Sequence, residues 1–155
     1  KNYINLLKAF NKLSNKKIAL VILGEGKQRS FLENYIADND LTDRVILLGF
    51  VQNPFIWLNS CDLFVSSSER EGFGNAIVEA MAYGLNVVST DCVGPKEILK
   101  DGDFGILVEK NNPQALVEGI NELLNFPNKF NKNNILNRAE DFSETKIFKH
   151  YDEVL

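Results

Sequence analysis

Cysteine and histidine are scarce in this sequence. Its 155 residues include two cysteines and one histidine. Cys61 and Cys92 lie far apart beside apolar, strand-like runs, which is typical of reduced, buried thiols rather than of a disulfide framework. The chain also offers no set of side chains typical of a transition-metal site. We therefore expect reduced thiols, no metal and a cytosolic protein.

A basic surplus and long apolar runs are missing as well. The formal net charge is -4, whereas nucleic-acid-binding proteins usually carry excess positive charge, so no nucleic-acid partner is expected. The longest apolar runs, 18–23 and 45–48, are far shorter than the roughly 20 residues of a membrane-spanning helix. The first residues form an amphipathic segment and do not resemble a signal peptide.

The overall composition is that of a globular domain. Hydrophobic residues make up 45% of the chain and charged residues 25%, which argues against disorder and against a fibrous repeat. A chain of this length fits one domain with a core of its own. We predict a single domain over residues 1–155.

Short apolar segments alternate with segments of helical periodicity. Strands are predicted at 17–23, 44–48, 62–65, 86–90 and 104–108. Helices are predicted at 2–15, 27–39, after Pro54, at 74–83 and 95–100, from Pro113 onward and at 142–154, with a polar connector at 125–134. This alternation is typical of the α/β class with a doubly wound parallel sheet, in which ligands bind beyond the carboxyl ends of the strands.

The third predicted strand runs into a glycine-rich turn, S-S-S-E-R-E-G-F-G-N, and then into a helix. Gly72 and Gly74 lie where a strand-to-helix turn brings the backbone close to a ligand, and free amides at a helix N-terminus suit a diphosphate. Glu79 follows Glu71 by eight positions and lies about one and a half turns into the helix. There its carboxylate can accept two hydrogen bonds from a diol such as a ribose.

These residues resemble the E-x7-E signature of retaining, metal-independent glycosyltransferases with the GT-B fold, the glycosyl transferases group 1 of family 4 type. Other segments resemble the same family in the same order: L-G-E-G-K-Q-R, R-V-I-L-L-G-F-V, C-D-L-F-V-S-S-S, E-A-M-A-Y-G-L-N-V-V-S-T-D, G-P-K-E-I-L and G-I-L-V. The matches cover residues 1–124, and residues 143–155 resemble the closing helix of the family. The resemblance implies the carboxyl-terminal, donor-binding half of such an enzyme, a Rossmann-like domain.

The resemblance also implies roles for individual residues. Glu71, as the catalytic residue, would hold hydroxyl groups of the donor sugar, and Glu79 would hold the ribose. Lys1 would neutralise the diphosphate in place of a metal ion. The remaining donor-binding residues would contact the sugar and diphosphate (Gly72, Phe73, Gly74, Asn75) or lie beside the nucleotide and its base (Gly24, Gly26, Phe50, Val51). Glu25, Arg29, Arg70 and Lys96, near the mouth of the site, are interpreted as ordinary surface charges.

The resemblance further implies parts that this sequence lacks. The family's carboxyl-terminal domain begins one strand earlier, and in the strand order 3-2-1-4-5-6 that strand is the central one. We expect a gap in the sheet between 17–23 and 62–65, and no turnover by this chain alone. The absent amino-terminal domain would supply the acceptor site and any peripheral contact with the inner face of the membrane. The donor is expected to be a UDP- or GDP-linked sugar, with no other cofactor, and the acceptor a glycan or lipid-linked glycan in surface polysaccharide or lipopolysaccharide synthesis.

Other interpretations were weighed against this one. A non-catalytic nucleotide-binding remnant, or a partner subunit, stays open, as does a nucleotide-sugar epimerase with the same architecture. A nicotinamide-dependent Rossmann enzyme is suggested by the glycines at 24 and 26. It fails in detail, because G-x-G-x-x-G needs a third glycine where Arg29 stands.

Overall fold

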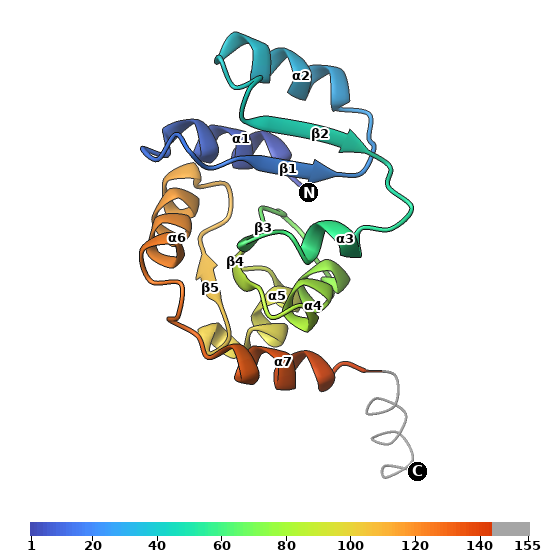
Figure 1. The fold of residues 1–155 in the computed structure, drawn as a ribbon, viewed down its shortest axis with the longest axis vertical. Coiled ribbons are helices and arrows are strands. Elements are labelled where there is room, and N and C mark those ends of the chain that lie inside the picture. Colours follow the sequence, from blue (N-terminus) through green and yellow to red (C-terminus); the bar gives the residue numbers. More distant parts are fainter. Residues whose placement is uncertain (144–155) are drawn as a thin grey trace.

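The computed structural model describes residues 1–143, which form parallel strands covered by helices on two faces (Figure 1). The strands are β1 Leu20–Leu23, β2 Val45–Gly49, β3 Leu63–Ser66, β4 Asn86–Thr90 and β5 Ile106–Val108. The helices are α1 Tyr3–Lys12, α2 Arg29–Asp38, α3 Phe55–Leu58, α4 Asn75–Ala82, α5 Val93–Ile98, α6 Pro113–Asn125 and α7 Lys132–Glu140, with a 3-10 turn, η1, at Lys100–Gly102.

The strands form two separate parallel sheets. Strand β1 pairs with β2, while β3, β4 and β5 pair in that order. Within residues 1–143 no ladder joins β1 to β3, and Figure 1 shows the β1–β2 pair set apart from the other three strands. We call this junction the seam. The seam lies where the gap in the sheet is expected, and the α/β class predicted from the sequence is confirmed.

The three-stranded sheet is covered on both faces. Val88 and Val108 face the core that α1 and α6 share, whereas Val87 and Leu107 face α4 and α7. Successive side chains of a strand point to opposite faces, so a run of apolar residues buries both sides of the sheet. The doubly wound arrangement follows from these continuous apolar strands.

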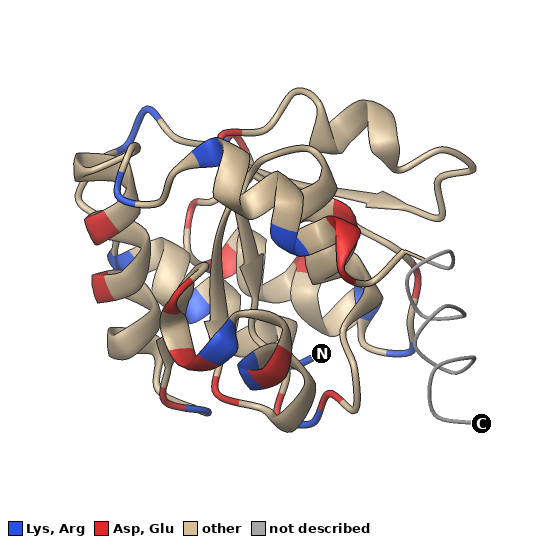
Figure 2. Cartoon of the chain, turned by 90° about the horizontal axis from the view of Figure 1, so that it is seen from below, with Lys and Arg blue, Asp and Glu red and all other residues tan. Residues whose placement is uncertain are grey.

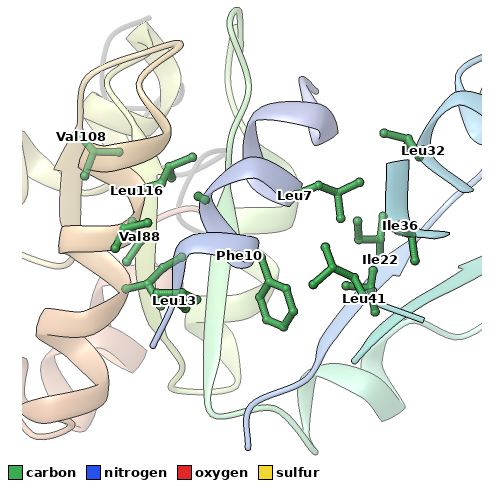
Figure 3. Packing of buried hydrophobic residues seen from close by; sticks show 14 of the residues in the cluster. Leu7, Phe10, Leu13, Ile22, Leu32, Ile36, Leu41, Val88, Val108 and Leu116 are labelled. Atoms are coloured by element: carbon green, nitrogen blue, oxygen red, sulfur yellow. The ribbon is translucent and has the colours of Figure 1, made fainter. Parts of the chain in front are cut away.

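Helix α1 packs against both sheets. Leu7, Phe10 and Leu13 are buried on its inner face. Figure 3 shows Leu7 and Phe10 directed toward Ile22 of β1 and its neighbours, and Leu13 beside Val88 of β4. Burying side chains of this size contributes about 1.5–3 kcal/mol each, so α1 packing compensates for hydrogen bonds missing at the seam.

Several predicted boundaries were wrong. Residues 132–134 belong to α7 and not to a polar connector, because the Asn131 side chain accepts hydrogen bonds from two first-turn amides and Ile135 and Ala139 are buried against α4. Strands β1 and β5 begin later than predicted, and α5 begins two residues earlier. The predicted helix at 142–154, and the closing helix at 143–155, fall outside the described residues except at their first positions.

Candidate functional site

The loops that follow β1 and β2 lie together at the carboxyl ends of these strands. Gly24 has φ 112°, a value that favours glycine, and its N–H donates to the carbonyl of Gly49 at 2.7 Å. Gly26 is exposed in the first loop. In the second, Phe50 is 82% exposed and Val51 is half-buried. These residues, predicted to lie beside the nucleotide or its base, therefore share the carboxyl end of the two-stranded sheet.

Residues 68–74, the glycine loop, connect β3 to α4. Gly74 has φ 115° and caps α4, its carbonyl accepting from the Ile77 amide at 2.8 Å. The first amides of any helix have no acceptor within it. Across residues 1–143, the N–H groups of Gly72, Gly74 and Asn75 donate no hydrogen bond. The loop and the first residue of α4 thus hold three amides without an acceptor beside the positive end of the α4 dipole.

Lys1 and Glu71 form an ion pair at this loop. The Lys1 Nζ lies 2.5 Å from Glu71 Oε2, and the hydroxyl of Ser68 donates to the same oxygen at 3.2 Å. The side chain of Glu71 is 18% exposed and that of Lys1 is 55% exposed. The hydrogen bond from Lys1 lowers the pKa of Glu71, against the opposing effect of burial. Glu71 is therefore held as a carboxylate at the mouth of the site.

The backbone of Lys1 is itself fixed over the end of β3. The buried hydroxyl of Ser67 donates to the carbonyl of Lys1 at 3.0 Å and lies 3.2 Å from that of Asn2. The side-chain amide of Asn2 donates to the side-chain oxygen of Asn111, in the loop after β5, at 2.8 Å. The predicted position of Lys1 beside the glycine loop thus has several anchors.

Glu79 lies on α4, half-buried, and within the part of the chain that the structure describes its side chain forms no hydrogen bond or ion pair. A carboxylate withdrawn from water without a partner is costly, which makes Glu79 a candidate to accept hydrogen bonds from a ligand. Phe73 is 39% exposed, and its ring meets that of Phe142 edge-on at 5.6 Å. A hydrogen-bonded ion pair joins Lys1 to Glu71, but among residues 1–143 no hydrogen bond or ion pair links either side chain to Glu79 or to the loops after β1 and β2.

Arg29 and two nearby glutamates form ion pairs with one another at the surface near the site. Arg29 bonds to Glu25 at 2.6 Å and to Glu33 at 2.8 Å, and the bond to Glu33 is the main reason its pKa is raised. Arg29 also donates to the carbonyl of Leu47 at 3.1 Å, which ties α2 to β2. Figure 2 shows acidic and basic residues interspersed over helices and loops. Among residues 1–143 no helix is long and apolar enough to cross a membrane.

Sequence reasoning assigned no site residue to the turn between β4 and α5, taken here as residues 90–94, from the last residue of β4 to the second of α5. Thr90 Oγ1 and Cys92 Sγ bond to the carbonyl oxygen of Ser68 at 2.6 and 3.2 Å, and the Gly94 amide donates to the carbonyl of Glu71 at 3.2 Å. Cys92 is buried, as predicted, yet it contacts the glycine loop. The available signal was the pair Gly94-Pro95 in the first turn of α5, four residues after β4 ends. Proline is favoured at the start of a helix, and glycine there permits close approach of another backbone segment.

Comparison with known proteins identifies this arrangement. The family model of glycosyl transferases group 1 matches residues 1–141. An N-acetylgalactosamine-N,N'-diacetylbacillosaminyl-diphospho-undecaprenol 4-alpha-N-acetylgalactosaminyltransferase of Campylobacter jejuni is 36% identical over 95% of this chain and 41% of its own length. The capsular polysaccharide biosynthesis glycosyltransferase CapM of Staphylococcus aureus is 32% identical over 77% of this chain and 32% of its own length.

Solved structures agree with the sequence comparisons. Anabaena HepE, crystallised in complex with UDP-glucose, is 27% identical and superposes with a TM-score of 0.89 over 99% of this chain and 44% of its own. This chain therefore spans less than half the length of these relatives. It belongs to the glycosyl transferases group 1 family.

Proposed function

We propose that this chain is the donor-binding half of a retaining glycosyltransferase and that it holds a UDP- or GDP-linked sugar at the carboxyl ends of its strands. The observation that carries the proposal is the row of free amides in the glycine loop beside the paired Lys1 and Glu71. Two observations on relatives support the proposal: the HepE structure contains UDP-glucose, and the matched proteins are named as transferases. The chemistry of the whole protein is part of this proposal.

The diphosphate would lie on the amides of Gly72, Gly74 and Asn75. These amides and the N-terminus of α4 carry partial positive charge and need no rearrangement to meet an anion. Lys1 would add a full positive charge where the leaving diphosphate gains negative charge during transfer. In this proposal these groups replace a metal ion, and no serine, cysteine or histidine of the chain attacks the sugar.

The two glutamates would bind different parts of the donor. Glu71, at the mouth of the loop, would accept hydrogen bonds from hydroxyls of the sugar, and Glu79 would accept those of the ribose. The loops at Gly24, Gly26 and Phe50 with Val51 would approach the nucleotide and base through their backbone. Charge-assisted hydrogen bonds of this kind are worth about 1.5–3 kcal/mol each.

The acceptor would bind to an amino-terminal domain that this sequence does not include. The Campylobacter relative is named for a saccharide on diphospho-undecaprenol, and the Staphylococcus relative for capsular polysaccharide. We propose a glycan or lipid-linked glycan acceptor in surface polysaccharide or lipopolysaccharide synthesis. Transfer would take place in the cytoplasm, at the inner face of the membrane.

The ribose assignment is tested with Glu79→Ala. Loss of a carboxylate that binds two hydroxyls should weaken nucleotide-sugar binding by about 2 kcal/mol, a roughly thirtyfold rise in Kd. Isothermal titration calorimetry of the purified protein with UDP-, GDP- and ADP-sugars measures this change. Glu118→Ala, an exposed position in the middle of α6, is the matched control and should leave the Kd unchanged. Equal affinities in the two variants would refute the assignment.

A further inference from the structure

The backbone carbonyls of the glycine loop point toward the turn between β4 and α5. The carbonyl of Ser68 accepts hydrogen bonds from Thr90 and Cys92, and the carbonyl of Glu71 accepts one from Gly94. Thr90 is fully buried and Cys92 is 4% exposed, so water does not compete for these bonds. Two points along the loop are therefore tied to one turn.

A third point of the loop is held by close packing. A Cβ atom at Gly94 would lie 1.9 Å from the carbonyl oxygen of Phe73 and 2.5 Å from its Cα. Because a positive φ is absent at Gly94, the position needs glycine for space and not for backbone conformation. Phe142 covers the ring of Phe73 edge-on at 5.6 Å, and Arg138 of α7 stacks on Phe142. The loop is thus supported by α5 and by the segment after α7.

This support fixes which way the free amides point. In a trans peptide the N–H of one residue is antiparallel to the C=O of the residue before it, and no cis peptide bond occurs within residues 1–143. Since the carbonyls of Glu71 and Phe73 are held against Gly94, the amides of Gly72 and Gly74 point away from α5. A rotation of either peptide would turn a negative carbonyl oxygen outward in their place.

We propose that Gly94 is a positioning residue, which orients the Gly72 and Gly74 amides toward the phosphates of a nucleoside diphosphate. The inference rests on the proposed function and extends it to a residue outside the ligand contacts. Gly94 acts through the loop backbone and does not touch the donor. Thr90 and Cys92 contribute by fixing the start of the loop.

The test compares Gly94→Ala with Gly105→Ala. Both glycines are crowded: a Cβ at Gly105 would lie 2.9 Å from the carbonyl oxygen of Val87 and 2.9 Å from the Leu99 side chain, away from the glycine loop. Both substitutions should lower Tm. Only Gly94→Ala should reduce the preference for a nucleoside diphosphate over the corresponding monophosphate, by about tenfold or more, as expected for a lost charge-assisted hydrogen bond. Calorimetry with UDP and UMP, and with GDP and GMP, measures this ratio.

A second measurement does not depend on nucleotide. Arg70 lies exposed in the glycine loop, so release of the loop should accelerate tryptic cleavage after Arg70 in Gly94→Ala and not in Gly105→Ala. If the unsubstituted protein binds no nucleotide, the proposed function fails and the cleavage rates decide whether Gly94 holds the loop. An unchanged affinity ratio together with unchanged cleavage overturns the inference.

If Gly94→Ala does not fold, two less disruptive substitutions at Thr90 test the same inference. Thr90→Val removes the hydroxyl that bonds to the carbonyl of Ser68, whereas Thr90→Ser retains it. We expect the diphosphate preference to fall and cleavage to rise in Thr90→Val, and both to return to unsubstituted values in Thr90→Ser. Indistinguishable Thr90→Val and Thr90→Ser proteins would contradict the role assigned to this turn.

Discussion

At the scale of single residues, Glu71 shows how a neighbour sets a charge state. Its folded pKa is lowered, chiefly by the hydrogen bond from Lys1. A carboxyl with a depressed pKa contributes stability above its unfolded pKa and loses that stability as the pH falls through the folded value. Because Lys1 is largely exposed, the gain from this pair is small, in the range of surface ion pairs.

Lys1→Met should raise the pKa of Glu71. The substitution removes both the hydrogen bond and the charge, while the burial that opposes ionisation remains. A titration of the Glu71 side-chain carboxyl carbon by NMR measures the shift, with Lys8→Met, an exposed lysine on α1, as the control. If Glu71 titrates identically in the two variants, the hydrogen bond from Lys1 is not what lowers its pKa.

Sequence reasoning identified Glu71 and Lys1 because their residue types and order match a family pattern. It did not identify Gly94, whose importance comes from a carbonyl oxygen 21 positions earlier in the chain, that of Phe73. Contacts through backbone atoms leave little trace in residue type, apart from the requirement for a missing side chain.

At the scale of elements, α7 shows why a polar segment can still be a helix. Residues 125–134 are rich in asparagine and lysine and carry little apolar periodicity, so propensity alone predicts a connector. The helix forms because Asn131 caps it and because Ile135 and Ala139 pack on α4. Tertiary packing supplies most of the stability of such short helices, and the sequence does not show where the packing surface lies.

Removal of the α7 cap should destabilise the protein measurably. The Asn131 side chain accepts from the amides of Asn133 and Asn134 at 2.9 and 3.3 Å, so Asn131→Ala should lower the free energy of unfolding by about 1 kcal/mol. Asn131→Ser keeps a capping oxygen and should retain most of that stability. Urea unfolding monitored by circular dichroism compares them, and equal losses in both variants would exclude the cap as the cause.

At the scale of the whole molecule, the seam interrupts the hydrogen bonding of the strands, but one hydrophobic core extends across it. The alternation of strands and helices was enough to predict the parallel α/β class, and the gap was expected from the family's strand order. The way in which α1 joins the two sheets was not predicted. Its amphipathic pattern shows that one face is buried but not that this face touches both β1 and β4 (Figure 3).

The seam predicts a pattern of hydrogen exchange in the 155-residue chain. The Leu20 amide donates to the carbonyl of Arg44 at 2.8 Å, on the β2 side of β1. Successive amides of a strand point to opposite edges, so that of Val21 points toward the seam. In a monomeric sample, exchange followed by NMR should be fast for Val21 and slow for Leu20. Comparable protection of both amides would show that the edge of β1 is paired.

The same junction gives the chain a natural place to be divided. Residues 50–62, which include α3, connect the two sheets. A break at 50–54 therefore severs no strand ladder and leaves two pieces that meet chiefly through α1 against α6. Under the proposed function, one piece holds the loops for the base together with Lys1, and the other holds the glycine loop for the diphosphate. A nucleotide sugar that contacts both pieces would then stabilise their association. If each piece were fused to one half of a split fluorescent protein, the fluorescence would increase with the concentration of the nucleotide sugar.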